Sequence, residues 1–127
     1  MAKILVIDDS DLARKLVRQI LEPDGHQILE ATNGLAALES YSLEQPDLVM
    51  LDLTMEGMHG LEVLSQLRAL DPRARIVVAT ADIQDATRRL VGELGAVGFV
   101  TKPFRADAVR ETVMAALKGG TEHAAQP

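Results

Sequence analysis

The sequence of 127 residues has no cysteine and no tryptophan, and it has only one tyrosine and two phenylalanines. The lack of cysteine excludes disulfides, thiolate metal ligands and a cysteine nucleophile, and it agrees with a reducing compartment. We therefore expect a cytoplasmic protein. Because aromatic residues are so few, the hydrophobic core has to be aliphatic.

A long apolar segment and an excess of basic residues are also missing. The N-terminal Met1-Ala2-Lys3 leads straight into a short apolar run, which fits neither a signal peptide nor a membrane span. The formal net charge is −6, which disfavours non-specific binding to nucleic acids. We therefore predict no membrane association and no direct nucleic-acid partner.

The chain is long enough for one domain with one core. Five short apolar runs rich in β-branched residues alternate with amphipathic stretches, which is typical of βα units. This alternation predicts an α/β fold, a doubly wound parallel sheet of five strands with helices on both faces. The predicted strands span residues 3–7, 26–31, 47–51, 75–80 and 97–101.

Capping residues and apolar spacing place the helices between these strands. Ser10 is the predicted N-cap of the first helix, which ends at Pro23-Asp24-Gly25, and Asn33 is the predicted N-cap of the second. The later helices are predicted over residues 34–44, 60–70, 83–94 and 105–118.

The last two helices have predicted buried stripes and a predicted end. The inward-facing residues are Ile83, Ala86, Leu90 and Leu94 in the fourth helix and Val109, Val113 and Leu117 in the fifth. Gly119-Gly120 is expected to end the fifth helix. Residues 1–118 then form the domain, and residues 119–127 form a flexible C-terminal tail or a truncated linker.

Three carboxylates follow directly after two of the apolar runs. Asp8 and Asp9 follow the first predicted strand, and Asp52 follows the third. If these strands are parallel neighbours, all three acids meet at one edge of the sheet. Like charges a few ångströms apart cost roughly 4 kcal/mol per pair at an effective dielectric near 20, so the cluster needs a counter-ion or a raised pKa. The hard oxygen ligands suit Mg²⁺.

Two further strand ends complete this candidate site. Thr80 ends the fourth predicted strand, and Lys102 follows the fifth. In an open parallel sheet the reactive groups collect at the carboxyl ends of the strands. Asp52 can act as a nucleophile, while Thr80 and Lys102 can donate to negative charge that develops during a transfer. The set favours phosphoryl transfer, with an aspartyl phosphate as its product.

The set Asp8-Asp9, Asp52, Thr80 and Lys102-Pro103 resembles the receiver domain of two-component response regulators, of the single-domain chemotaxis type. The resemblance implies a flavodoxin-like (βα)5 fold with strand order 2-1-3-4-5. It implies that Asp52 accepts a phosphoryl group from a sensor histidine kinase, a phosphotransfer protein or a small phosphodonor. Asp9, Asp52 and the carbonyl of Thr54 would bind Mg²⁺ directly, and Asp8 would act through water.

The resemblance also implies a conformational switch. Lys102 would contact Asp52 or the phosphoryl group, and its bond to Pro103 would be cis. Thr80 would move toward the phosphoryl group, and Phe99 would rotate inward behind it. The face of the fourth helix, fifth strand and fifth helix would then gain or lose a downstream protein target. Such a domain is a signalling module that promotes its own phosphoryl transfer and dephosphorylation, rather than a conventional enzyme.

Some positions depart from the family's pattern or have two interpretations. Glu56 stands where most receivers have a proline, and His59 stands where most have an acid, so we expect a more mobile loop after Asp52. Thr54 and Asp82 are expected to tune the lifetime of the phosphoaspartate. The basic residues Arg14, Lys15 and Arg18 form either a kinase-docking strip or a solvated helix face.

Three other functions are weaker. A phosphohydrolase of the haloacid dehalogenase type would use Asp9-Ser10-Asp11, but the chain lacks the late acidic pair and the length for a cap. A flavodoxin-like cofactor binder is disfavoured because two acids would repel a phosphate. A degenerate receiver that acts as a scaffold is disfavoured by the complete site. A stand-alone receiver and an excised one both stay open, as do chemotaxis control, a phosphorelay shuttle and a detached regulator domain.

Overall fold

The computed structural model describes residues 1–54, 60–81 and 85–125. Glu56, His59, Asp82 and Ile83, for which the sequence makes predictions, lie outside these ranges. The elements in chain order are β1 (Lys3–Ile7), α1 (Asp11–Leu21), a 3₁₀ turn η1 (Glu22–Asp24), β2 (Gln27–Ala31), α2 (Gly34–Glu44), β3 (Leu48–Asp52), α3 (Gly60–Leu70), β4 (Ile76–Thr80), α4 (Asp85–Glu93), β5 (Gly98–Thr101) and α5 (Ala106–Ala125).

The strands form one parallel sheet in the order β2-β1-β3-β4-β5, which confirms the predicted fold class and strand order. The strand bounds agree with the prediction to within one residue. Ile7 is in register with Leu51 of β3 and with Ala31 of β2. Because β1 and β3 are adjacent and in register, the residues that follow them come out side by side at the carboxyl edge of the sheet.

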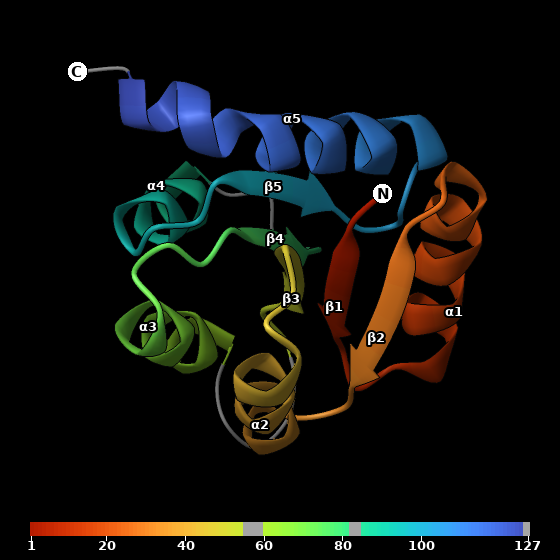
Figure 1. Ribbon diagram of the computed structural model, residues 1–127, viewed down its shortest axis with the longest axis horizontal. Coiled ribbons are helices and arrows are strands. Elements are labelled where there is room, and N and C mark those ends of the chain that lie inside the picture. Colours follow the sequence, from red (N-terminus) through yellow and green to blue (C-terminus); the bar gives the residue numbers. More distant parts are fainter. Residues whose placement is uncertain (55–59, 82–84, 126–127) are drawn as a thin grey trace.

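The helices form two layers, one on each face of the sheet (Figure 1). Alternate strand residues point to opposite faces, so each strand supplies both layers of core. The layer with α1 and α5 contains Ile4, Val6, Val17, Leu48, Met50, Val77, Val109 and Val113. The layer with α2, α3 and α4 contains Leu5, Ile7, Tyr41, Val49, Leu51, Leu64, Ile76 and Val91. Both layers are aliphatic apart from a few aromatic residues, as the composition predicts.

The predicted helix caps are present. The Ser10 hydroxyl accepts a hydrogen bond from the Ala13 N–H at 3.1 Å, and the Asn33 side chain accepts one from the Ala36 N–H at 2.8 Å. Each bond satisfies one of the backbone donors that a helix start leaves unpaired. None of the helices in the described parts of the chain is long and apolar enough to cross a membrane.

Two details of the predicted helices are wrong. Leu90 is 40% exposed, and among the described side chains of α4 it is Val91 that is buried, at 2% exposure. The contact of α4 with the sheet selects the buried face, and one residue along a helix rotates that face by about 100°. The fifth helix continues through Gly119-Gly120 to Ala125. Glycine costs a helix about 1 kcal/mol per residue, which weakens it without forbidding it. The domain boundary after residue 118 stays a prediction.

Candidate functional site

The three carboxylates lie together at the carboxyl edge of the sheet. Carboxylate oxygens of Asp8, Asp9 and Asp52 all lie within 4.8 Å of one another. Asp8 and Asp52 are buried, at 3% and 2% exposure, while Asp9 is exposed. Three hard oxygen donors this close, with one of them open to solvent, fit a small divalent cation such as Mg²⁺ that keeps part of its water shell.

Among the described residues, Lys102 supplies a positive charge to this cluster. Its ammonium nitrogen lies 2.9 Å from Asp8 Oδ2 and 3.5 Å from Asp52 Oδ2. The resemblance implies a contact with Asp52 or the phosphoryl group. The structure shows the contact with Asp52 and a shorter one with Asp8. The ammonium therefore bridges the two buried carboxylates.

Burial and ion pairing shift the pKa values of the charged groups in opposite directions. Burial raises the pKa of Asp8 above its usual value, and the charge of Asp52 adds to this, although the Ser10 N–H and Lys102 partly offset both effects. Burial alone would lower the pKa of Lys102, but the hydrogen bond to Asp8 and the charges of both acids raise it above its usual value. Lys102 is therefore a fixed positive charge at neutral pH.

Thr54 covers Asp52 from the loop side. Its hydroxyl donates to Asp52 Oδ1 at 2.9 Å and lies 3.2 Å from Oδ2, and its N–H donates to Oδ1 at 3.2 Å. The side chain of Thr54 is exposed, so it stands between Asp52 and solvent. Thr54 thus contacts Asp52, as its position two residues further along predicts. A role for its carbonyl as a metal ligand stays a prediction.

Thr80 and Lys102 lie side by side because β4 and β5 are paired. Thr80 is buried at the end of β4, in register with Thr101, and its carbonyl accepts a hydrogen bond from the Lys102 N–H at 2.9 Å. The Lys102–Pro103 bond is cis, as the resemblance implies. The sheet therefore brings together the strand ends that the sequence singles out.

Two arginines have contacts that the sequence does not reveal. The guanidinium carbon of Arg88 on α4 lies 4.8 Å from the centroid of the half-buried Phe99 ring, within range of a cation–π contact. Arg14 on α1 is buried, so of the two interpretations of the basic residues the solvated helix face is wrong for this residue. The contact of Arg88 joins α4 to β5, and the bond of Arg14 to Glu30 joins α1 to β2, so both depend on how a helix lies against a strand rather than on a local sequence pattern.

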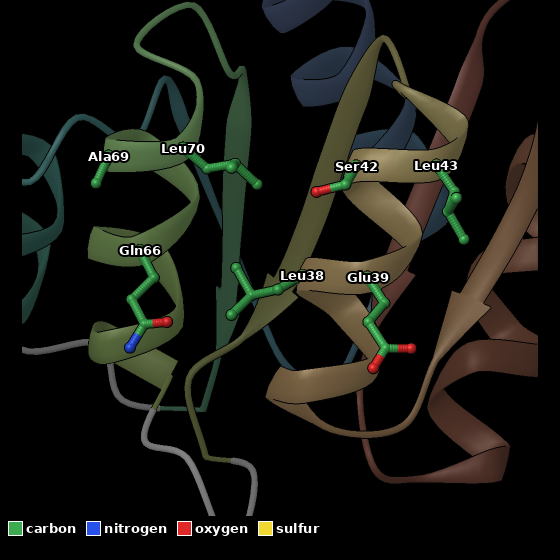
Figure 2. A pocket seen from close by; sticks show the side chains of 7 residues that line it. All are labelled: Leu38, Glu39, Ser42, Leu43, Gln66, Ala69 and Leu70. Atoms are coloured by element: carbon green, nitrogen blue, oxygen red, sulfur yellow. The ribbon is translucent and has the colours of Figure 1, made fainter.

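A surface groove of about 750 Å³ lies away from this site, between α2 and α3. Figure 2 shows Leu38 and Leu70 extending into the space between the two helices. The lining of the groove consists of Leu38, Glu39, Ser42, Leu43, Gln66, Ala69 and Leu70. One carboxylate, one hydroxyl and one amide among apolar side chains do not make up a phosphoryl-transfer site, so the carboxyl edge of the sheet is the candidate site.

Gly60 keeps the chain after Asp52 in place by close packing. A Cβ atom at position 60 would lie 2.4 Å from the Leu53 Cα and 2.7 Å from its carbonyl oxygen. Backbone atoms cannot move aside as a flexible side chain can, so Gly60→Ala is expected to lower the free energy of unfolding by about 1–3 kcal/mol. Urea unfolding measures this change. Gly92→Ala on α4 is the control, because, apart from the adjacent helix backbone, no atom of the described residues lies within 4 Å of its added Cβ. Equal effects of the two substitutions would contradict the packing argument.

A comparison with known families decides what kind of domain this is. The model of the response regulator receiver domain matches residues 4–114. The chain belongs to this family. Receiver domains are signalling modules of two-component systems, and the acidic cluster of this receiver domain lies within the matched residues.

Individual relatives agree with this assignment. The receiver domain is 38% identical to the chemotaxis protein CheY of Listeria monocytogenes, over 93% of this chain and all of that protein. It is 37% identical to sporulation initiation phosphotransferase F of Bacillus subtilis, over 87% of this chain and 90% of that protein. The crystal structure of NtrX from Brucella abortus matches 96% of this chain with a TM-score of 0.90 and 31% identity. This chain spans 28% of the length of NtrX.

Proposed function

We propose that Asp52 of this receiver domain accepts a phosphoryl group and that the modification controls binding to a partner protein. The environment of Asp52 supports this most directly. Asp52 is a buried carboxylate that lies beside Asp8 and Asp9, and the Lys102 ammonium lies 3.5 Å from its Oδ2. A carboxylate oxygen of Asp52 would form the new bond to phosphorus. The bond from phosphorus to the donor's histidine nitrogen, or to the oxygen of a small acyl phosphate, would break.

In this proposal the acidic cluster would also bind Mg²⁺. Asp8, Asp9, Asp52 and the carbonyl of Thr54 would hold Mg²⁺, with Asp8 acting through water. When bound, the ion supplies charge neutralisation between the carboxylates and the phosphoryl oxygens. Lys102 would donate to one phosphoryl oxygen and the Thr80 hydroxyl to another, since both lie at the ends of paired strands beside Asp52.

The response would reach the surface through β5. Phe99 lies three residues before Lys102 on β5, and its ring is covered by Arg88 from α4. Movement of Thr80 toward the phosphoryl group would make room for Phe99 to turn inward, which alters the face formed by α4, β5 and α5. A sensor histidine kinase or phosphotransfer protein would load the domain in the cytoplasm, and a downstream protein would read it. The similarity to a chemotaxis protein and to a sporulation phosphotransferase supports a phosphoryl-donating partner and a downstream protein partner.

The test is incubation of the purified protein with acetyl phosphate, with Mg²⁺ or with EDTA, followed by intact mass spectrometry. The expected result is the mass of one added phosphoryl group in the presence of Mg²⁺ and none in EDTA. Addition that does not depend on the metal would contradict the role of the acidic cluster. No addition with either a small donor or a histidine kinase would contradict the function itself.

Thr54 is expected to control how long the phosphoryl group stays. Its hydroxyl occupies the solvent side of Asp52, so Thr54→Ala should admit water and shorten the half-life of the phosphoaspartate. The expected factor is about fivefold, equivalent to one hydrogen bond of about 1 kcal/mol. Loss of the phosphoryl mass over time measures it. Thr54→Ser retains the hydroxyl and should stay near the wild-type value, and an equal change in both variants would exclude this role of the hydroxyl.

A further inference from the structure

Arg14 is a buried charge outside the proposed phosphorylation site. The buried polar and charged residues in the described parts of the chain are Asp8, Arg14, Asp52 and Thr80. Three of these belong to the site, and the fourth is Arg14, whose side chain is 9% exposed. Arginine is almost never buried unless it is paired, so its contacts have to account for it.

Each nitrogen of the Arg14 guanidinium has a hydrogen-bond or ion-pair partner. Nε donates to Glu30 Oε1 at 2.7 Å, Nη1 donates to the carbonyl oxygen of Asp8 at 2.7 Å, and Nη2 pairs with the carboxylate of Asp11. The second oxygen of Glu30 accepts from Arg18 Nε at 3.0 Å. The planar fork is therefore fixed in direction by β2 on one side and by the start of α1 on the other.

The contact with the Asp8 carbonyl bears on the site. That carbonyl belongs to the planar peptide unit that joins Asp8 to Asp9. Its direction therefore sets the position of the backbone nitrogen and Cα of Asp9. On the other side of the residue, the Asp8 N–H donates to the Ala31 carbonyl at 3.1 Å. The two bonds hold the end of β1 between β2 and α1. The loop with both acids is thus fixed by its backbone, independently of Lys102.

The charge of Arg14 is compensated where it lies. Glu30 and Asp11 surround its guanidinium, and the pKa of Glu30 is lowered by Arg18 and Arg14. A free arginine this near to the cluster would repel a divalent cation, whereas one neutralised by two carboxylates can orient the backbone with little repulsion. The paired Arg14 guanidinium is therefore better suited to orienting the backbone than to changing the charge of the cluster.

We propose that Arg14, anchored by Glu30, is a positioning residue that fixes the Asp8–Asp9 peptide unit and so prepares the acidic cluster for its cation. The inference rests on the proposed function in one respect, the binding of Mg²⁺. Partners that orient metal ligands from behind typically change affinity by 10- to 100-fold when mutated. We expect the Kd for Mg²⁺, measured by calorimetry, to rise about tenfold in Arg14→Gln, in Arg14→Lys and in Glu30→Gln.

Arg18→Gln is the matched control. Arg18 lies one turn further along α1 and also pairs with Glu30, but its other hydrogen bonds go to Glu22 and to the Ile28 carbonyl rather than to the Asp8 carbonyl. Its side chain is 35% exposed. Its Kd for Mg²⁺ should stay within about twofold of the wild type. An equal rise in Arg14→Gln and Arg18→Gln would overturn the proposal. A wild-type Kd for Mg²⁺ in Arg14→Lys would also overturn the proposal, because a positive charge at position 14 would then be enough without the hydrogen bonds of the guanidinium.

A second measurement needs no metal. The backbone amide signals of Asp9 and Ser10 in a ¹H–¹⁵N spectrum recorded in EDTA should shift more in Arg14→Lys than in Arg18→Gln. Equal shifts would contradict positioning by Arg14. If the wild type binds no Mg²⁺, the metal role in the proposed function fails, while these amide shifts still decide whether Arg14 orients the loop. If Arg14→Gln does not fold, Arg14→Lys and Glu30→Gln provide the same comparison.

Discussion

Asp52→Asn is expected to abolish the Mg²⁺-dependent addition of a phosphoryl group from acetyl phosphate. The amide has no anionic oxygen to attack phosphorus, and no other carboxylate of the cluster is buried in contact with both Thr54 and Lys102. The substitution nearly preserves volume, so the core around position 52 should stay packed. Intact mass spectrometry of the variant should show the unmodified mass only.

The folded state of this variant should be at least as stable as that of the wild type without metal. Asp52 is one of three like charges whose oxygens lie within 4.8 Å, and its neutralisation removes repulsion. Asp47→Asn is the matched control, because Asp47 precedes the same strand at the opposite edge of the sheet and is exposed. It should be phosphorylated like the wild type. Persistent labelling of Asp52→Asn would move the acceptor to another residue.

Lys102→Ala is expected to destabilise the metal-free domain and to make its stability depend strongly on Mg²⁺. The substitution leaves Asp8 and Asp52 buried without the ammonium that bridges them. Removing one partner of a buried ion pair costs about 3–5 kcal/mol, and solvent access to Asp9 and Lys102 reduces the expected loss to about 2–4 kcal/mol. Urea unfolding in EDTA measures this loss.

Saturating Mg²⁺ should restore more stability to Lys102→Ala than it adds to the wild type. In the variant the ion meets uncompensated carboxylates, whereas in the wild type it has to share them with the ammonium. The same variant should still bind the metal but lose the phosphorylation-dependent change in partner binding. Lys15→Ala on the exposed side of α1 is the control and should stay within about 0.5 kcal/mol of the wild type. Equal stabilities of Lys102→Ala and Lys15→Ala in EDTA would refute the role of Lys102 as the counter-ion.

The strand ends of this protein could be placed from the sequence because the sheet is parallel. Apolar runs with β-branched residues indicate buried strands, and parallel strands present their carboxyl ends at one edge. Asp8, Asp52 and Lys102 were therefore expected at the same edge of the sheet, and the strand order that brings them close together was implied by the resemblance. The helix caps Ser10 and Asn33 were equally local, since each bonds a backbone N–H three residues away.

Contacts between helices and distant strands could not be placed in the same way. Which face of α4 is buried depends on how the helix lies on the sheet, so Val91 rather than Leu90 points inward. The pairing of Arg14 with Glu30 depends on the distance between α1 and β2, which no local pattern encodes. The close approach of Gly60 to Leu53 likewise arises only when α3 docks.

The sequence by itself determined the fold class, the strand ends and the residue types that meet there, because these follow from hydrophobic periodicity and from the geometry of a parallel sheet. The tertiary structure decided how those groups are arranged. It placed the Lys102 ammonium nearer to Asp8 than to Asp52, set the Thr54 hydroxyl over Asp52, and buried Arg14 behind the Asp8–Asp9 peptide unit. Distances of a few ångströms between charges and donors depend on side-chain packing across several elements, and that packing exists only in the folded chain.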